Sequence, residues 1–537
     1  MQRGLVGLLA IVLGVASAEA GPPNILWLSC EDMSPRLGCY GDAVAQTPNI
    51  DRLASQGVRY TRAFTATGVC APCRHTIITG VYPTQSGAQY MRTGSYSSAS
   101  AKADQTRPLY EATPPEGVRC FTESLRAGGY YCTNNSKEDY QFKAPVTAWD
   151  DSSKQAHYRN RAPGQPFFAV FNATVTHESG VHGEKLRSPR VIDPADVRVP
   201  SFLPDTPAVR DDLARHYDNI AALDAWVGEK LAELEAEGVA DETVVLFFSD
   251  HGDGLPRHKR WVYDSGTHVP LIVRWPDGRR AGEVDDRLMS FVDLAPTALA
   301  LAERVRPDYL RGRVFCGPDA EPAPDYVFMH RDRMDDTAIE TIRSVRGERF
   351  RYVRNYRPEQ PYLLPIAYRD RAATMGEVYR LRDAGELTPQ QWQLAAETKP
   401  LEELYDTEAD PDEVVNLATD PAYAAKLTEL SRALDGWIES TGDPLATDEV
   451  EVIKTRIWPP AGEQPTTAPP TVEYDRQRRV VTMSCETPGA SLGYRLPGEE
   501  TWRVYNGPFA YDAMPPMHYV AHRLGWKPSR VAMPYRE

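Results

Sequence analysis

The sequence predicts an α/β fold: a mostly parallel sheet flanked by helices, followed by a smaller α+β subdomain and an appended β-sandwich. Two observations lead to this prediction. Short apolar runs that end abruptly in polar residues alternate along the chain with segments of helical periodicity. Strands that alternate with helices imply a mostly parallel sheet covered on both faces. Around residues 458–470 the composition shifts toward proline and threonine, and short alternating runs follow.

The predicted strands are apolar throughout, which is typical of strands buried on both faces. They are expected at residues 24–30, 166–174, 244–249 and 269–275. Polar residues stand just past three of them: Glu31 and Asp32, His177, and Asp250 with His251. Ligands in such folds bind beyond the carboxyl ends of the strands, which is where these residues fall.

Two helices are predicted between the strands. One begins after Pro48, and the other spans residues 211–237, where apolar residues recur at helical spacing until Gly238 ends the pattern. Its apolar stripe comprises Leu213, Tyr217, Ile220, Leu223, Val227, Leu231 and Leu234.

The last part of the chain reads as a linker and a small β-sandwich. Proline, threonine and glycine over residues 458–470 indicate a semi-rigid linker. Turn residues at Pro488-Gly489 and Pro497-Gly498 divide the alternating runs beyond it. The predicted organisation is a signal peptide at 1–20, a catalytic α/β domain at 21–315, a C-terminal subdomain at 316–445, a Pro-rich linker at 446–470 and a β-sandwich at 471–537.

The first twenty residues have the pattern of a secretory signal. Arg3 gives a positive start, residues 5–15 are apolar, and small residues up to Ala20 offer cleavage sites. The apolar run is shorter than the ~20 residues that a membrane span needs. We therefore expect an exported protein, periplasmic or extracellular, whose mature chain does not span a membrane.

The charge balance excludes one class of partner. The chain has 60 basic and 75 acidic residues, a net charge of −15. This balance argues against nucleic acid, whose partners carry basic surfaces. An anionic substrate must then be held by a local basic pocket rather than by the overall field.

The segment Cys70-Ala71-Pro72-Cys73-Arg74 predicts an anion site. Pro72 suits the first turn of a helix, so Cys70 lies where free backbone N–H groups converge, and Arg74 adds a planar set of donors. Two alternatives stay open: a disulfide, or half of a zinc site that lacks a second pair of ligands. In an oxidising compartment some of the eight cysteines are expected to pair, but their partners are not assignable from the sequence.

Glu31, Asp32 and Asp250 predict a metal site. They follow two separate buried strands and together offer the oxygen ligands that calcium or another hard cation prefers. Without a cation the three carboxylates would repel one another. Lys137, Lys259 and His177 complete the set. His177 follows its strand either to cap it or to protonate a leaving oxygen.

These residues resemble the type I sulfatases, which belong to the alkaline phosphatase-like superfamily. The motifs are P-N-I-L-W-L-S-C-E-D at 23–32, T-P-N-I-D-R-L-A at 47–54, G-V-C-A-P-C-R-H-T-I-I-T-G at 68–80, S-D-H-G at 249–252, P-L-I-V-R-W-P at 270–276 and E-L-Y-D-T-E-A-D-P-D-E-V-V-N-L at 403–417. They cover nearly everything from the signal to about residue 440. The last segment resembles fibronectin-like, chitobiase-type modules at the ends of carbohydrate-active enzymes.

The resemblance implies a function for each site residue. A maturase oxidises the family's cysteine, here Cys70, to formylglycine (3-oxoalanine), and a hydroxyl of the hydrated aldehyde attacks sulfur. One calcium ion is implied, with ligands at Glu31, Asp32, Cys70, Asp250 and His251. Arg74 looks like the residue that orients the nucleophile, Lys137 and Lys259 like the sulfate-binding lysines, His177 like the acid for the leaving oxygen, and Asp139 like a further substrate-binding residue.

Four residues depart from the family pattern. Glu31 replaces the usual first aspartate, His251 stands where asparagine is common, Cys73 replaces a serine, and Asp139 occupies the place of a second histidine. Imidazole is a less natural ligand for calcium, which leaves the metal open. Cys73 offers Cys70 a disulfide partner before maturation.

The function expected from the resemblance is removal of sulfate from a sulfated carbohydrate. Three alternatives stay open: a sulfamidase like the heparan N-sulfatases, a phosphodiesterase or phosphonate hydrolase on the same scaffold, and a glycan-binding protein without activity. The sulfated sugar and the position of its sulfate are not defined by the sequence.

Overall fold

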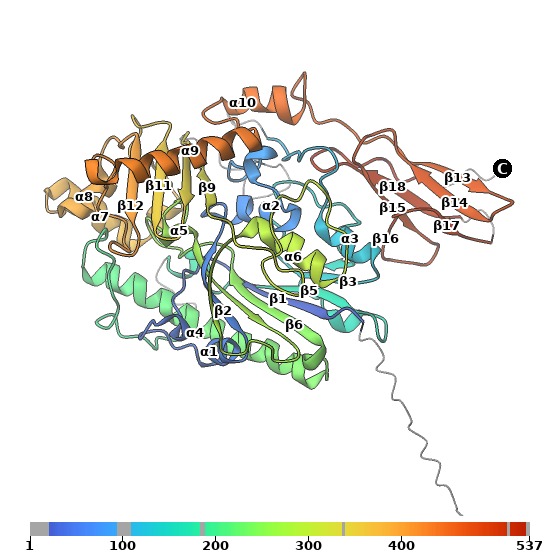
Figure 1. Ribbon diagram of the computed structural model, residues 1–537, viewed down its shortest axis with the longest axis horizontal. Coiled ribbons are helices and arrows are strands. Elements are labelled where there is room, and N and C mark those ends of the chain that lie inside the picture. The colour runs from blue at the N-terminus through green and yellow to red at the C-terminus, as the bar shows by residue number, and fades with distance from the viewer. Residues whose placement is uncertain (1–20, 94–108, 183–187, 336–338, 513–515, 533–537) are drawn as a thin grey trace, which may run out of the picture.

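The computed structural model describes residues 21–93, 109–182, 188–335, 339–512 and 516–532 (Figure 1). The predicted signal peptide lies outside these residues. Among the helices of the described chain, none is both long and apolar enough to cross a membrane.

The centre of the molecule is an eight-stranded sheet with the order β4-β3-β5-β1-β6-β7-β2-β8. Seven strands run in the same direction, and β7 pairs antiparallel with both of its neighbours. The strands are β1 Asn24–Cys30, β2 Val58–Phe64, β3 Tyr131–Asn135, β4 Asp151–Ser152, β5 Phe167–Ala173, β6 Thr243–Ser249, β7 His268–Arg274 and β8 Val284–Ser290. The predicted mostly parallel sheet is confirmed, and each of the four predicted strands is present within one residue at either end.

Helices cover both faces of this sheet because its strands present apolar side chains alternately to either side. In β1, Leu26 and Leu28 pack on one face with residues of α1 and α4, whereas Ile25 and Trp27 pack on the other with residues of α2, α3 and α6. Figure 1 shows these two groups of helices on opposite sides of the sheet. The helices are α1 Pro48–Ser55, α2 Cys70–Thr79, α3 Phe121–Ala127, α4 Pro207–Ala236 and α6 Leu294–Leu301, and a single turn, α5 Asp264–Thr267, precedes β7.

Helix α4 begins four residues before its predicted start. Pro207 occupies the first turn, where its fixed φ suits the helix and its missing N–H costs nothing. Thr206 caps the helix, since its side chain accepts from the backbone N–H of Val209. The apolar stripe alone did not reveal this capped first turn.

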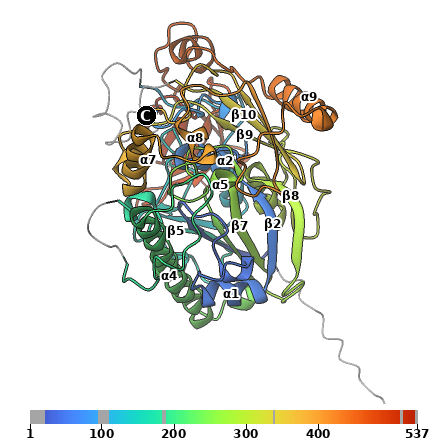
Figure 2. The same cartoon turned by 90° about the vertical axis from the view of Figure 1, so that its left-hand side faces the viewer.

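A second, antiparallel sheet forms the smaller subdomain. Its order is β12-β11-β10-β9, with β9 Val327–Arg331, β10 Ile342–Arg346, β11 Phe350–Asn355 and β12 Glu402–Asp406. Helix α9 (Ala424–Thr441) covers it, packing Leu430, Leu434 and Trp437 against Val345 and Tyr352. Helices α7 (Ala373–Ala384) and α8 (Pro389–Ala395) complete the subdomain, and α7 lies against α4 (Figure 2).

The end of the chain forms two three-stranded antiparallel sheets that share one apolar core. Their orders are β13-β14-β17 and β16-β15-β18. The strands are β13 Thr471–Asp475, β14 Val480–Ser484, β15 Ser491–Arg495, β16 Arg503–Val504, β17 Phe509–Ala510 and β18 His518–His522. Val481 and Met483 of one sheet pack with Leu492, Tyr519 and Ala521 of the other. This is a small β-sandwich, and its likeness to fibronectin-like modules stays a prediction.

The segment predicted as a linker contains a short helix, α10 Glu449–Val452, that continues as a helical turn over Ile453–Ile457. Val452, Ile457 and Trp458 are buried against Tyr90 and Tyr110 of the α/β domain. This part of the segment is therefore docked on the α/β domain. The domain boundaries themselves stay predictions.

Candidate active site

The strand register brings three predicted polar clusters to one edge of the sheet. At the centre of the sheet, Cys30 at the end of β1 pairs with Ala173 of β5 and with Ser249 of β6. The residues that follow these three strands therefore meet just beyond their carboxyl ends. Lys137 comes to the same edge because it follows β3, a strand that the sequence analysis did not identify.

Glu31, Asp32 and Asp250, here called the carboxylate cluster, are fully buried at this edge. The backbone N–H of Asp32 donates to Asp250 Oδ1 at 3.2 Å, which joins the two strand ends. Asp32 has φ +52°, a left-handed conformation that aspartate tolerates better than most residues. Its Oδ2 accepts from the backbone N–H of Glu178 at 2.8 Å. Backbone contacts thus fix the cluster before any ligand binds.

Cys70 is the first residue of α2 and is buried, as the anion-site prediction requires. Its Sγ lies 3.4 Å from Nε2 of His251. Burial opposes ionisation of this thiol, but the positive charges of Lys259, Lys137 and His251 outweigh burial and lower the pKa of Cys70 to about 6. The position favours a negatively charged group.

Arg74 lies one helical turn beyond Cys70. Its Nε donates to Asp250 Oδ2 at 3.1 Å, and its Nη1 donates to Asn172 Oδ1 at 2.7 Å. Asn172 belongs to β5, and its amide donates in turn to Asn134 Oδ1 at 2.9 Å. The guanidinium is therefore held between the ends of β5 and β6. Through it, α2 is attached to the carboxylate cluster.

Lys137 and Lys259 bring two ammonium groups to the cluster. Lys137 Nζ lies 2.8 Å from Glu31 Oε1, and Lys259 Nζ lies 2.9 and 2.7 Å from the two oxygens of Asp32. Burial would lower the pKa of each lysine, but nearby negative charges, Cys70 among them, raise both values. Both lysines are therefore charged at neutral pH.

His177 points one ring nitrogen into the site. The backbone N–H of Ser179 donates to Nδ1 at 3.3 Å, so the proton of the neutral ring is carried by Nε2. This Nε2 lies 3.7 Å from Glu31 Oε2. Asp139 lies at the edge of the site, with Oδ2 3.9 Å from Lys137 Nζ.

His251 bridges the carboxylate cluster and Cys70. Its Nδ1 donates to the carbonyl of Gly252 at 2.9 Å, which leaves Nε2 facing Asp32 Oδ1 at 3.2 Å and Asp250 Oδ1 at 3.5 Å. Burial alone would lower the pKa of His251, but the charges of Asp250, Asp32 and Cys70 raise it to about 9. A metal bound at Nε2 would have to displace this proton.

Cys73 does not pair with Cys70. All eight cysteines fall within the described residues, and each is a free thiol. Cys73 Sγ donates to the backbone carbonyl of Asp250 at 2.7 Å and accepts from Thr65 Oγ1 at 3.0 Å. Burial, chiefly, raises its pKa well above the ordinary value. The expected disulfide is therefore not formed, and among the described residues Cys73 belongs to neither group of side chains that could hold a metal ion.

The residues fit a hard cation. Ligand atoms of Glu31, Asp32, Cys70 and His177 all lie within 4.8 Å of one another, as do those of Cys70, Asp250 and His251. The carboxylate oxygens are buried, come from different strand ends and converge on Cys70. Calcium takes six to eight oxygen ligands in flexible geometry, which suits a cluster built mainly of carboxylates.

Sequence reasoning missed the residues that hold the predicted ones. Glu178 accepts two hydrogen bonds from Arg260, both 2.9 Å long, and lies 3.0 Å from Lys259 Nζ. Glu178 directly follows His177, and Arg260 directly follows Lys259. This adjacency to predicted residues is the sequence signal that could have identified both. Asn172 was hidden because it stands inside an apolar strand.

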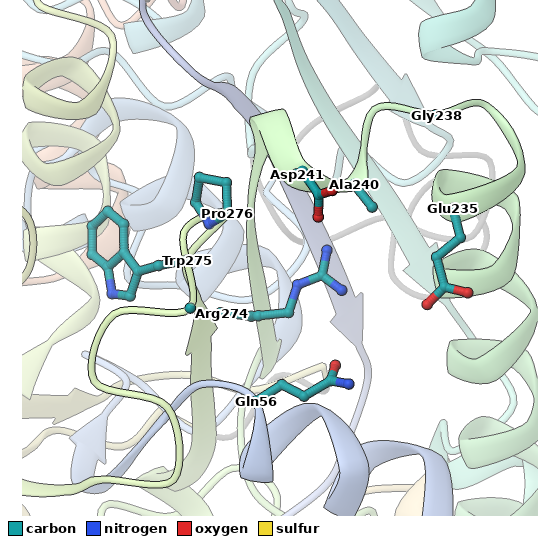
Figure 3. A pocket seen from close by; sticks show the side chains of 9 residues that line it. Gln56, Glu235, Gly238, Ala240, Asp241, Arg274, Trp275 and Pro276 are labelled. Atoms are coloured by element: carbon teal, nitrogen blue, oxygen red, sulfur yellow. The ribbon is translucent and has the colours of Figure 1, made fainter.

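A pocket of about 500 Å³ lies at the other end of the sheet (Figure 3). It is lined by Gln56, Glu235, Asp241 and Arg274 among others. Arg274 pairs with Val245 near the start of β6, whereas Asp250 follows the end of that strand. The pocket is therefore separated from the carboxylate cluster by the length of the sheet.

The fold and the buried site define a hydrolase of the sulfatase type. The family model described as sulfatase matches residues 23–304, and the one described as N-sulphoglucosamine sulphohydrolase, C-terminal, matches residues 256–399. An ulvan-active sulfatase from Formosa agariphila is 42% identical over 95% of this chain and 90% of its own length. The human N-sulphoglucosamine sulphohydrolase is 29% identical over 84% of this chain and 96% of its own length. The chain belongs to the sulfatase family and is a hydrolase of sulfate esters.

Solved structures show the same fold at low identity. A putative sulfatase from Bacteroides thetaiotaomicron aligns with a TM-score of 0.58 and 20% identity over 80% of this chain and 95% of its own. A phosphonate monoester hydrolase from Silicibacter pomeroyi aligns with a TM-score of 0.57 and 17% identity over 79% and 96%. At these identities the alignments concern the fold alone.

Proposed function

We propose that this sulfatase removes sulfate from a sulfated carbohydrate, with Cys70 converted to formylglycine and a calcium ion at the carboxylate cluster. The observation that carries the proposal is the surroundings of Cys70: it begins α2 and meets two lysines, His251 and buried carboxylates. The carbohydrate is suggested by the ulvan-active relative, which is similar over nearly the whole chain.

The residues present fit both a bound calcium ion and the conversion of Cys70 to formylglycine. The carboxylates of Glu31, Asp32 and Asp250, with Nε2 of His251, would hold calcium, which as a Lewis acid withdraws charge from a sulfate oxygen. Formylglycine at position 70 would supply a hydrated aldehyde as nucleophile. Arg74, anchored to Asp250 and Asn172, would keep this nucleophile in place.

The remaining residues bind and protonate the substrate. Lys137 and Lys259 stay charged at neutral pH, so their ammonium groups would contact sulfate oxygens and explain how an acidic protein binds an anion. His177 presents Nε2–H toward the site, so it would donate a proton to the departing sugar oxygen. Asp139, which lies beside Lys137, would contact the sugar.

Substitution of Cys70 tests the proposal. Cys70→Ala is expected to release no sulfate, and Cys70→Ser to be inactive or to stall as a sulfated serine. Cys73→Ser is the matched control, since its hydroxyl still donates to the Asp250 carbonyl and it is expected to release sulfate. Sulfate release is measured by ion chromatography and position 70 by peptide mass spectrometry, both in protein made with a competent maturase. Activity with an unconverted Cys70 thiol contradicts the proposal.

The sulfamidase is the second candidate, and a specific observation favours it. Residues 256–399 match the C-terminal family of N-sulphoglucosamine sulphohydrolases. Parallel assays with glucosamine N-sulfate and 6-O-sulfate separate the two candidates. Matched aryl sulfate and phosphate esters test the phosphonate or phosphodiester alternative, which a higher kcat/KM on phosphate would support.

Export and maturation complete the proposal. The signal-like pattern of residues 1–20 supports a periplasmic or extracellular location, and a mature N-terminus near residue 21 in secreted material would agree with it. A cytoplasmic protein that keeps these residues would contradict export.

A further inference from the structure

A row of alternating charges leads from the carboxylate cluster to the rim of the site. Lys259 contacts both Asp32 and Glu178. Glu178 is paired with Arg260, whose guanidinium also contacts Asp335 Oδ2 at 2.7 Å. Asp335 Oδ1 in turn accepts from Nε of Arg92 at 3.3 Å. The row is Asp32, Lys259, Glu178, Arg260, Asp335 and Arg92.

Arg92 is the exposed end of this row. Its side chain is 31% exposed, whereas the side chains of Lys259, Glu178 and Arg260 are at most 3% exposed. Its contact with Asp335 uses Nε, and its terminal nitrogens make no hydrogen bond to a residue that the structure describes. Within the part of the chain that the structure describes, the row therefore ends on a cation whose terminal nitrogens make no hydrogen bond, and such donors suit an anionic group of a ligand.

The chain places this pair directly beside Cys70. Met91 and Met334, the neighbours of Arg92 and Asp335, pack with Cys70 in one buried cluster that also contains Ile366. The charges that act on Arg92 include those of Asp139 and Cys70, and together with Asp335 they raise its pKa although burial opposes them. The packing of these neighbours and the charges that act on Arg92 thus place it near Cys70.

The backbone at Arg92 is strained. Its φ is +58°, a left-handed conformation that arginine rarely adopts, and Arg260 has φ +75°. Residues held in such a conformation are strained and cluster at ligand-binding sites. The neighbouring Met91 N–H donates to the Arg333 carbonyl at 3.0 Å, which ties the two segments of the pair together.

We propose that Arg92 binds a second anionic group on the sugar that carries the scissile sulfate, and so determines which substrates the enzyme prefers. The inference rests on the function proposed above. A guanidinium pairs with planar or tetrahedral oxyanions through two parallel hydrogen bonds, so the group is a carboxylate or a second sulfate ester. Arg92 is a specificity residue in this scheme and does not contact the reacting sulfur.

The test compares substrates with one and with two anionic groups in wild type and Arg92→Gln. The panel holds 4-nitrophenyl sulfate, N-acetylglucosamine 6-sulfate, a disulfated glucosamine and a sulfated disaccharide with a uronic acid. Loss of a charge-assisted pair is expected to lower the ratio of kcat/KM, two-anion over one-anion substrate, about 10- to 100-fold, chiefly through KM. Arg92→Lys keeps the charge but not the paired donors, so it is expected to fall in between.

Arg62→Gln is the matched control, because Arg62 is 25% exposed and pairs with Asp286 on the outer part of the sheet. It is expected to leave the ratio unchanged. A loss confined to the uronic acid assigns a carboxylate, and one confined to the disulfated sugar assigns a sulfate; both uphold the proposal. An equal loss on all substrates, or none, overturns it. Wild-type enzyme that releases sulfate from no substrate overturns the proposed function as well.

Discussion

At the scale of single residues, charge pairing decides what the site can do. The three acids of the carboxylate cluster meet three permanent cations, Arg74, Lys137 and Lys259. The sequence analysis expected these acids to repel one another without a metal, but the structure neutralises them with side chains. The same cations stabilise a negative charge at Cys70. An anionic substrate therefore meets ammonium groups that backbone and carboxylate contacts have already oriented.

His177 provides a prediction at this scale. If it protonates the departing oxygen, His177→Gln should reduce kcat/KM about 100- to 10,000-fold on a sugar sulfate, whose alcohol leaves only with a proton. The loss should be much smaller on 4-nitrophenyl sulfate, because nitrophenolate leaves without one. Steady-state rates on both substrates measure the difference. His182→Gln serves as control, since His182 is a neighbouring buried histidine whose ring packs edge-on against Tyr368. Equal losses on both substrates would assign His177 to binding instead.

At the scale of elements, the functional residues at strand ends could be predicted, but the residues that hold them in place could not. Glu31 and Asp250 were identified because each follows an apolar run, and the register of β1 with β6 then brings them together. The antiparallel direction of β7 relative to its neighbours was not predictable, since a run of apolar residues looks the same whichever way the strand runs in the sheet. Arg92 and Asp335 are 243 positions apart in loops, so no local pattern connects them.

Helix α2 carries a prediction about pH. His75 is fully buried, its Nδ1 donates to the Tyr140 carbonyl at 3.0 Å, and burial lowers its pKa to about 4. The unfolded chain takes up a proton near pH 6.5, but the folded chain does not, so stability is present above pH 6.5 and is lost as the pH falls toward 4. Between pH 7 and pH 5 this residue should cost about 2 kcal/mol.

Urea unfolding of wild type and His75→Gln at pH 7 and pH 5 measures this contribution. Glutamine can still donate to the Tyr140 carbonyl but does not titrate, so the variant should lose less stability over the same interval. His522→Gln is a useful comparison, because burial also lowers the pKa of His522 to about 4 in the distant sandwich. Identical losses in wild type and His75→Gln would show that His75 does not titrate as expected.

At the scale of the whole molecule, residues from the smaller C-terminal subdomain complete the site at the edge of the central sheet. Met334 and Ile366 belong to the region predicted as a separate subdomain, yet they pack on Cys70. The sandwich contacts the catalytic domain through buried polar groups: Ser491 Oγ donates to Glu123 Oε2 at 2.9 Å, and Arg119 donates to the Ala490 carbonyl at 3.1 Å. Composition distinguished these segments along the chain but carried no information about how they dock.

Arg523 is the residue on which this docking should depend most. Arg523 belongs to the sandwich and is 7% exposed. Its side chain donates to the carbonyls of Pro114 and Pro115, outside the sandwich, at 2.8 and 3.3 Å. Arg523→Ala removes these charge-assisted bonds and takes away the donor of the buried Pro114 carbonyl, a cost of about 1.5–3 kcal/mol, whereas the exposed Pro115 carbonyl still accepts from the backbone N–H of Val118. The sandwich should then melt separately, so that calorimetry shows two transitions and protease cleaves near residues 463–470.

Arg479→Ala, at an exposed pair with Asp512 inside the sandwich, should leave the melting profile unchanged. Because Arg523 is remote from Cys70, sulfate release at low temperature should survive its loss. A single, unshifted transition in Arg523→Ala would mean that the apolar contacts of Trp458 and its neighbours dock the sandwich without it.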